Sequence, residues 1–361
     1  MEKLSLKEKI AQMLIIEIQG KGLSEELIAM IKQSKVGGVI LFRKNYDSYE
    51  EMLELINGLK EANKNNKIPL LITIDQEGGR VNRMPPEFER VKNAYSIAKT
   101  KNIENVKNSS RIISRLLKES GIHLNYAPVL DIKRFEDNHP IGNRCYGDNK
   151  DDVKKYGIEF MKEMQREKII PAIKHFPGHG ATNKDSHLIL PVISKSIKEL
   201  ENDDTAPFIS AINNGADAIM VGHIIIKDID RKYPASLSKE IIQKYIIEKY
   251  KFKGLIITDD LKMLAIRLRY RNAKAVKLAI NAGSNMIIVG YKYNEINDVI
   301  NRIYKYVKEG EIQEEIIDNS IDKIIQIKYK YDVNDEKVKG IDIEQINKEI
   351  IKLNEEVLKN N

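Results

Sequence analysis

The residues best suited to chemistry lie together in the fourteen-residue stretch 174–187, which reads KHFPGHGATNKDSH. Three of the six histidines of the chain fall here, at His175, His179 and His187, and Asp185 stands two residues before the last of them. A segment this rich in titratable groups and glycine is a poor core strand and a poor surface helix. It is typical of a strand end that runs into a loop carrying acid–base chemistry.

Two chemistries fit these side chains. His175, His179, Asp185 and His187 are metal-ligand types, but their spacing matches no familiar zinc pattern such as His-Glu-x-x-His. The alternative is a His–Asp dyad, in which Asp185 orients His187 and tunes its proton affinity. Because the sequence also has no Walker or Rossmann glycine pattern, we favour the dyad and expect no metal and no cofactor.

Two other loops carry charged residues beside glycines. The stretch 75–83, DQEGGRVNR, places Asp75 before a Gly-Gly turn and ends on Arg83, and a second loop, 141–147, contains Arg144. A carboxylate, a glycine turn and arginines without helical partners are suited to holding hydroxyl groups or an anion.

Two adjacent acids, Asp259 and Asp260, end an apolar run that carries no basic residue. Successive side chains of a strand point to opposite faces. We therefore expect at most one of the two to face a site directly, and the other to cap a helix or support the site by hydrogen bonds.

Eight short apolar runs position these residues, and amphipathic helical patterns separate them. The runs are rich in Ile and Val, as expected for parallel strands buried on both faces. Their ranges are 14–17, 36–42, 70–75, 124–132, 172–176, 218–223, 255–260 and 286–290, and helices are predicted between them at 48–63, 105–120, 150–167 and 272–282. Eight strand–helix alternations predict an α/β fold, a (β/α)8 TIM-type barrel, over a doubly wound open sheet.

Polar side chains gather where the runs end. Asp75, Asp131, His175, His223 and Asp259 each stand at or near the carboxyl end of a run with an apolar interior. In a barrel these ends meet at one mouth, where active sites lie. The sequence therefore predicts one site built from several strand ends.

A catalytic barrel is expected over residues 1–331 and a helical tail over 332–361. In the tail, an apolar residue recurs at helical spacing from residue 343 to 357, which favours a helix docked on the barrel over a dimerisation helix. The net charge of +7 comes from interspersed lysines, so nucleic-acid binding is not expected. The lone Cys145, the absence of a signal-type h-region and the absence of a membrane-length apolar run predict a cytoplasmic protein without a membrane partner.

Long ordered motifs make the chain resemble a known family. KHFPGHG followed by DSH, with DQEGGRV upstream and ITDDLKM downstream, resembles the β-N-acetylglucosaminidases of glycoside hydrolase family 3. The resemblance runs from about residue 5 to about residue 331 and includes the supporting segments GGVILFRKN, NYAPVLDI, GNRCYG, MVGHI and PASLS. The DSH ending is its most discriminating part, because β-glucosidase-type relatives lack this histidine-bearing loop.

The resemblance implies a role for each matching residue. Asp259 would be the catalytic nucleophile, and His187, with Asp185 as its dyad partner, would be the general acid/base. The residues that would bind the sugar are Asp75, Arg83, Arg144, Lys174 and His175, whereas His179 receives no role. The implied activity is retaining hydrolysis of terminal β-linked N-acetylglucosamine, through a covalent glycosyl–aspartate intermediate.

The biological setting that the resemblance implies is the trimming of muropeptides during peptidoglycan recycling. Two alternatives stay open at this point. Some relatives with the histidine loop transfer the sugar to phosphate, so the chain is compatible with a β-N-acetylglucosaminide phosphorylase. The other alternative is a barrel that binds carbohydrate without catalysis. The substrate that the resemblance implies is a glycan containing N-acetylglucosamine.

Overall fold

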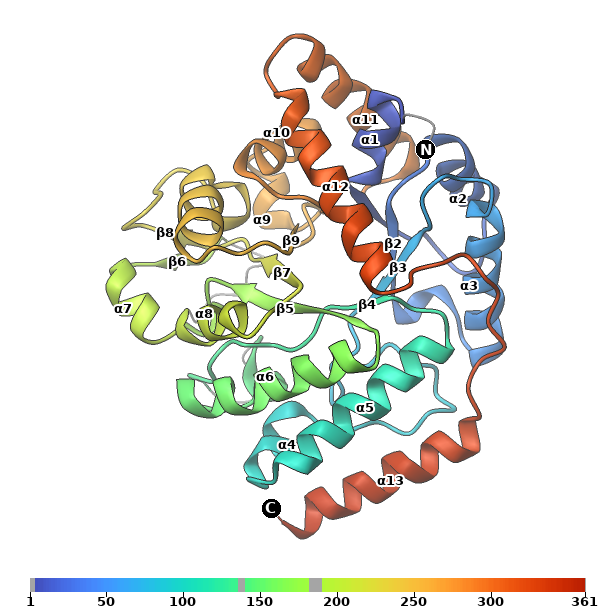
Figure 1. Ribbon diagram of the computed structural model, residues 1–361, viewed down its shortest axis with the longest axis vertical. Helices are drawn as coiled ribbons and strands as arrows, with labels where there is room; N and C mark the ends of the chain where they lie inside the picture. The colour runs from blue at the N-terminus through green and yellow to red at the C-terminus, as the bar shows by residue number, and fades with distance from the viewer. Residues whose placement is uncertain (1–3, 136–139, 182–189, 361) are drawn as a thin grey trace.

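Eight parallel strands form one sheet at the centre of the computed structural model, which describes residues 4–135, 140–181 and 190–360 (Figure 1). The order in the sheet is β10-β1-β2-β3-β4-β5-β7-β9. The strands are β1 (Leu14–Glu17), β2 (Gly38–Leu41), β3 (Leu71–Ile74), β4 (Leu124–Asn125), β5 (Ile170–Phe176), β7 (Ala218–Val221), β9 (Leu255–Thr258) and β10 (Ile287–Val289). Met286 bonds to the backbone of Ile256 and Thr258, which joins the two outer strands, so the sheet closes into a barrel.

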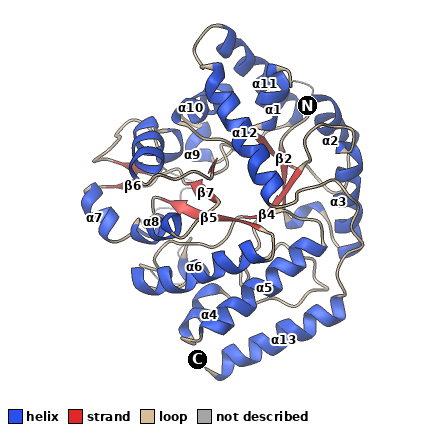
Figure 2. Ribbon diagram, viewed as in Figure 1, coloured by secondary structure: helices blue, strands red, loops and turns tan. Residues whose placement is uncertain are grey.

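Helices surround the strands on the outside of the barrel, as Figure 2 shows. They are α1 (Leu6–Gln12), α2 (Glu25–Ala29), α3 (Tyr49–Asn63), α4 (Ala94–Lys99), α5 (Ile103–Glu119), α6 (Lys150–Arg166), α7 (Ile197–Asn202), α8 (Ala206–Asn213), α9 (Leu264–Arg267), α10 (Asn272–Ala282), α11 (Tyr293–Lys308), α12 (Glu314–Lys330) and α13 (Ile343–Lys359). Two stretches, Met30–Ser34 and Glu240–Lys249, are π-helices. Among the described residues, no helix combines the length and apolar character that a membrane crossing requires.

The predicted barrel is confirmed, since every predicted run overlaps a barrel strand and the four predicted helices lie within two residues of observed ones. One run differs in length. The run 124–132 forms a strand only at Leu124–Asn125, because Pro128 has no N–H to donate to a neighbouring strand. The chain rejoins the sheet through a parallel bridge between Val129 and Lys174. Two short strands that the pattern did not indicate, β6 (Val192–Ile193) and β8 (Ile225–Ile226), pair outside the barrel.

The C-terminal helix α13 lies along α5 (Figure 1). Its apolar stripe enters the core, with Ile346, Ile350, Leu353 and Val357 all buried. An ion pair between Arg115 Nη1 and Glu349 Oε2, 2.7 Å apart, joins the same two helices. The apolar residues at 3-4 spacing in this helix therefore pack against the chain's own core.

Candidate active site

A cavity of about 530 Å³ lies at the carboxyl ends of the barrel strands. It brings together most of the residues that the sequence singles out. Those that line it are Asp75, Arg83, Arg144, Lys174, His175 and Asp259. The two other predicted site residues, Asp185 and His187, lie outside the described residues.

The loop after β3 is folded so that Asp75 and Arg83 both border the cavity. Gly78 and Gly79 have φ angles of +87° and +56°, which residues other than glycine adopt only at an energetic cost. The loop conformation therefore requires the Gly-Gly pair. Gln76 then closes the loop, because its Oε1 accepts the backbone N–H of Arg83 at 2.7 Å. The side chain of Asn125 in β4 pairs with both backbone groups of Gln76, at 2.9 Å each, and fixes the loop to the barrel.

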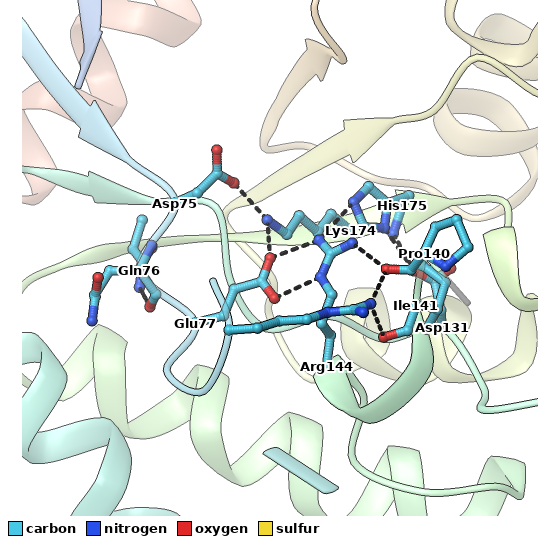
Figure 3. Close-up of polar contacts among 11 residues, drawn as sticks. Asp75, Gln76, Glu77, Asp131, Pro140, Ile141, Arg144, Lys174 and His175 are labelled. Atoms are coloured by element: carbon cyan, nitrogen blue, oxygen red, sulfur yellow. Dashed lines mark hydrogen bonds and ion pairs between the residues drawn. The ribbon is translucent and has the colours of Figure 1, made fainter. Parts of the chain in front are cut away.

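Glu77 is the centre of a buried charge cluster (Figure 3). Its carboxylate accepts two bonds from the Arg144 guanidinium, at 2.7 and 2.8 Å, in the forked geometry that arginine favours. Lys174 Nζ lies 2.6 Å from Glu77 Oε1 and also 2.6 Å from Asp75 Oδ1. Two cations and two carboxylates therefore alternate along the cavity wall.

The cluster is strongly biased toward its ionised form. Burial alone would raise the pKa of Glu77, but the adjacent charges of Arg144 and Lys174 outweigh burial and hold that pKa well below its usual range. Burial likewise opposes the charge of Arg144, yet Glu77 and the nearby carboxylates raise the pKa of the guanidinium. The wall thus offers fixed charges to a ligand and needs no proton transfer to form them.

The end of β5 presents two consecutive residues to the cavity. The register of β5 against β7 shifts between Ile173 and Phe176, so the strict alternation of faces breaks down and both Lys174 and His175 line the cavity. Lys174 is only 1% exposed. His175 Nδ1 lies 2.6 Å from Asp131 Oδ2, and its Nε2 lies 3.5 Å from the Arg144 guanidinium.

The turn that follows β5 packs closely against its neighbours. The backbone N–H of His179 donates to Asp131 Oδ1 at 2.5 Å. A Cβ on Gly180 would stand 2.2 Å from the carbonyl oxygen of Ile132, and one on Gly178 would stand 2.8 Å from that of Asp204. The two glycines of the PGHG motif are therefore required for close approach, and His179 lies buried at the cavity edge, where burial lowers its pKa to about 4.

The adjacent acids at the end of β9 have different surroundings. Asp260 Oδ1 accepts the backbone N–H groups of Lys262 and Gly290, at 2.8 and 2.9 Å, so this carboxylate joins the β9 and β10 loops. Burial raises the pKa of Asp260 to about 6. The Asp259 carboxylate accepts the backbone N–H of Asp260 at 2.8 Å and lines the same cavity. The expectation that one acid of the pair supports the site by hydrogen bonds therefore fits Asp260.

Sequence reasoning assigned no specific role to two buried carboxylates, Glu77 and Asp131. Both stand within motifs that carry the family resemblance, DQEGGRV and NYAPVLDI, and Asp131 stands near the end of a predicted strand. That placement was the available signal. Neither motif reveals that each carboxylate bonds to residues of another loop. Within the described ranges, no three His, Cys, Asp or Glu side chains are arranged to hold a metal ion.

Comparison with known proteins agrees with this architecture. Residues 5–327 match the model of the glycosyl hydrolase family 3 N terminal domain. The chain belongs to glycoside hydrolase family 3. The family predicted from the motifs is thereby confirmed, and this family 3 enzyme has the barrel expected of it.

Two curated sequence relatives and one solved structure are similar to this family 3 enzyme over most of its length. A β-hexosaminidase of Xylella fastidiosa (strain 9a5c) is 30% identical over 297 residues, which cover 81% of this chain and 87% of the relative. A β-hexosaminidase of Tolumonas auensis is 34% identical over 278 residues, 76% of this chain and 81% of the relative. A solved family 3 β-N-acetylglucosaminidase from Paenibacillus sp. str. FPU-7 is 30% identical, with a TM-score of 0.91 over 98% of this chain and 69% of that one.

Proposed function

We propose that this family 3 enzyme is a retaining β-N-acetylhexosaminidase that releases terminal β-linked N-acetylglucosamine. The observation that carries the proposal is the convergence on one cavity of Asp259, at a strand end, and the charge cluster of Glu77, Arg144 and Lys174. Fixed charges of both signs suit a ligand covered with hydroxyl groups, which donate to carboxylates and accept from cations. The names of the relatives described above agree with this activity.

In this proposal hydrolysis proceeds in two steps. Asp259 attacks the anomeric carbon while His187 protonates the leaving oxygen, so the glycosidic bond breaks as a covalent glycosyl–aspartate forms. Water, deprotonated by His187, then displaces Asp259 and restores the starting protonation states. His187 and its partner Asp185 are assigned from the motif. An imidazole with a pKa of about 6.5 can give and then take a proton near neutral pH.

Asp259 is the better nucleophile of the two adjacent acids. One oxygen of Asp260 already accepts two backbone N–H groups, and its raised pKa of about 6 leaves it partly protonated in mild acid. A nucleophilic carboxylate must be ionised, and its attacking oxygen must be accessible to the anomeric carbon. Asp75, Arg83, Arg144, Lys174 and His175 then hold the hydroxyl and acetamido groups of the terminal sugar.

Variants at the two adjacent acids test the nucleophile. With a nitrophenyl β-N-acetylglucosaminide, Asp259→Asn should lower kcat by on the order of 10³-fold or more, as loss of a nucleophile does in other covalent mechanisms. Asp260→Asn, the matched control, should keep a much larger share of the activity. Near-normal turnover by Asp259→Asn would remove the nucleophile from the proposal, and a product first released as the α-anomer would remove the retaining mechanism.

The finer features of the proposal have tests of their own. The products are compared with and without phosphate in the buffer. If a sugar 1-phosphate forms when phosphate is present, the reaction is phosphorolysis and not hydrolysis. We propose that the natural substrates are muropeptides and that the enzyme recycles them in the cytoplasm. The expected result is a higher kcat/KM for a muropeptide than for chitobiose. Cell fractionation checks the location.

A further inference from the structure

We infer that Asp131 is a positioning residue for this active site: its buried carboxylate holds the ring of His175 in one tautomer, with Nε2 presented to the cavity as an acceptor. The inference rests on the proposed function only in taking His175 as a sugar ligand. Asp131 itself is fully buried and does not line the cavity.

Both oxygens of the Asp131 carboxylate are engaged. Oδ2 lies 2.6 Å from His175 Nδ1, and Oδ1 accepts the backbone N–H of His179 at 2.5 Å. Burial alone would raise the pKa of Asp131, but His175 and His179 outweigh burial and keep it below its usual value. The carboxylate is therefore ionised, and an ionised carboxylate only accepts hydrogen bonds.

The tautomer of His175 follows from its two neighbours. Because Nδ1 faces an acceptor, Nδ1 carries the ring proton, and in the neutral ring Nε2 then keeps its lone pair. Nε2 faces the Arg144 guanidinium at 3.5 Å, and that group can only donate. The opposite tautomer would direct a lone pair at Asp131 and an N–H at Arg144, so both contacts would become repulsive. Because the Arg144 contact is long at 3.5 Å, the Nε2 lone pair at the cavity wall is available to accept the hydrogen of a sugar hydroxyl.

The turn after β5 prevents the carboxylate from rotating away from His175. Gly180 brings this turn so close to Ile132, next to Asp131, that no side chain fits between them. On its other side, Thr205 Oγ1 donates to the carbonyl oxygen of Pro177 at 2.7 Å. With the turn held at both sides, the His179 amide fixes one oxygen of Asp131 and directs the other at the imidazole.

A double-mutant cycle in the full chain tests this coupling. Asp131→Asn should lower kcat/KM for the nitrophenyl substrate by about 10–100-fold, a loss of the size seen when the group that orients a metal-binding histidine is removed. Because Asp131 acts through His175, the double variant Asp131→Asn/His175→Ala should lose no more than His175→Ala alone. Losses that multiply, or an Asp131→Asn enzyme with unchanged kcat/KM, would overturn the inference.

Nitrogen NMR of the unliganded wild type gives a readout that needs no substrate and no folded variant at Asp131. With ¹⁵N-labelled histidine, at a pH where the His175 ring is neutral, its signals should report a protonated Nδ1 and an unprotonated Nε2, and the reverse pattern would overturn the inference. Asp217→Asn is the matched control, because this carboxylate pairs with Lys330 at the amino end of β7. It should lower the Tm and leave kcat/KM and the His175 tautomer unchanged. A wild type inactive on the nitrophenyl substrate would contradict the proposed function and leave the NMR test intact.

Discussion

Replacing Glu77 by Gln changes the charge of a buried cluster without changing its shape. In the folded chain, Arg144 and Lys174 balance Glu77 and Asp75, so the four charges sum to zero. Glu77→Gln leaves one uncompensated positive charge among side chains that are between 2% and 18% exposed. In either orientation of the amide, its N–H₂ group faces at least one donor, so at least one hydrogen bond is lost as well.

The expected cost follows from how well the remaining groups compensate. Removing one partner of a buried ion pair costs about 3–5 kcal/mol. We expect the lower end, about 3 kcal/mol, because Asp75 still neutralises Lys174 and the carbonyl oxygen of Pro140 still accepts from Arg144. For a chain of this size that corresponds to a Tm lower by about 4 °C. A wall that no longer holds Arg144 and Lys174 in place should also reduce kcat/KM by about 100-fold, or about 3 kcal/mol of transition-state binding.

Thermal unfolding at several pH values and steady-state kinetics check these figures. A carboxylate whose folded pKa is lowered stabilises the protein above its ordinary pKa of about 4.3 and loses that effect as the pH falls through the lowered value. The Tm gap between wild type and Glu77→Gln should therefore be widest near neutral pH and narrow in acid. Glu163→Gln is the control, since Glu163 also pairs with two arginines, Arg111 and Arg166. The side chains of these arginines are 42% and 60% exposed, so water solvates their charges when the carboxylate is removed. Equal Tm losses in the two variants, or unchanged kcat/KM in Glu77→Gln, would refute the reasoning.

Two further pH effects follow from buried groups. Burial raises the pKa of Asp260 to about 6, so the ionised carboxylate destabilises the folded chain above that pH. Asp260→Asn should therefore raise the Tm at pH 8 by the equivalent of about 2–3 kcal/mol, and this gain should disappear below pH 4. A lower Tm of the variant at pH 8 would contradict this prediction. Burial lowers the pKa of Lys328 to about 7, so the unfolded chain binds a proton that the folded chain lacks, and stability should rise by several kcal/mol between about pH 7 and 10. Denaturant unfolding at pH 7 and pH 9.5 measures this rise in the free energy of unfolding, and Lys328→Met should reduce it. An equal rise in the wild type and the variant would show that Lys328 titrates normally.

The sequence predicts the fold well because barrel strands are local patterns. Each apolar run is short, rich in Ile and Val, and followed by a polar strand end, so the mouth of the barrel is located without any long-range contact. The prediction of strand length and side-chain direction is less accurate where a proline or a register shift interrupts the regular strand. Pro128 shortens the strand at 124–132, and the register shift in β5 brings both Lys174 and His175 to the cavity although strict alternation would separate them.

Glu77 and Asp131 were harder to assign because their roles depend on pairings between loops that are distant in sequence. Glu77 follows β3 yet bonds to Arg144 and Lys174, 67 and 97 residues further along, and Asp131 bonds to His175, 44 residues further along. A pattern along the chain shows that such residues stand near strand ends. It does not show which loops meet across the mouth, and therefore cannot separate a carboxylate that binds ligand from one that supports a ligand-binding residue.

The two supporting carboxylates answer the same physical requirement. A sugar carries no charge of its own, so it cannot neutralise buried cations such as Lys174 and Arg144 when it binds, and without Glu77 their desolvation would oppose folding. The same ion pairs fix both cations before the ligand arrives, so little side-chain entropy is lost on binding. Asp131 does for the single imidazole of His175 what Glu77 does for the two cations. Changes in this layer of carboxylates should therefore affect catalysis about as much as changes in the ligands that they hold, although neither residue needs to touch the sugar.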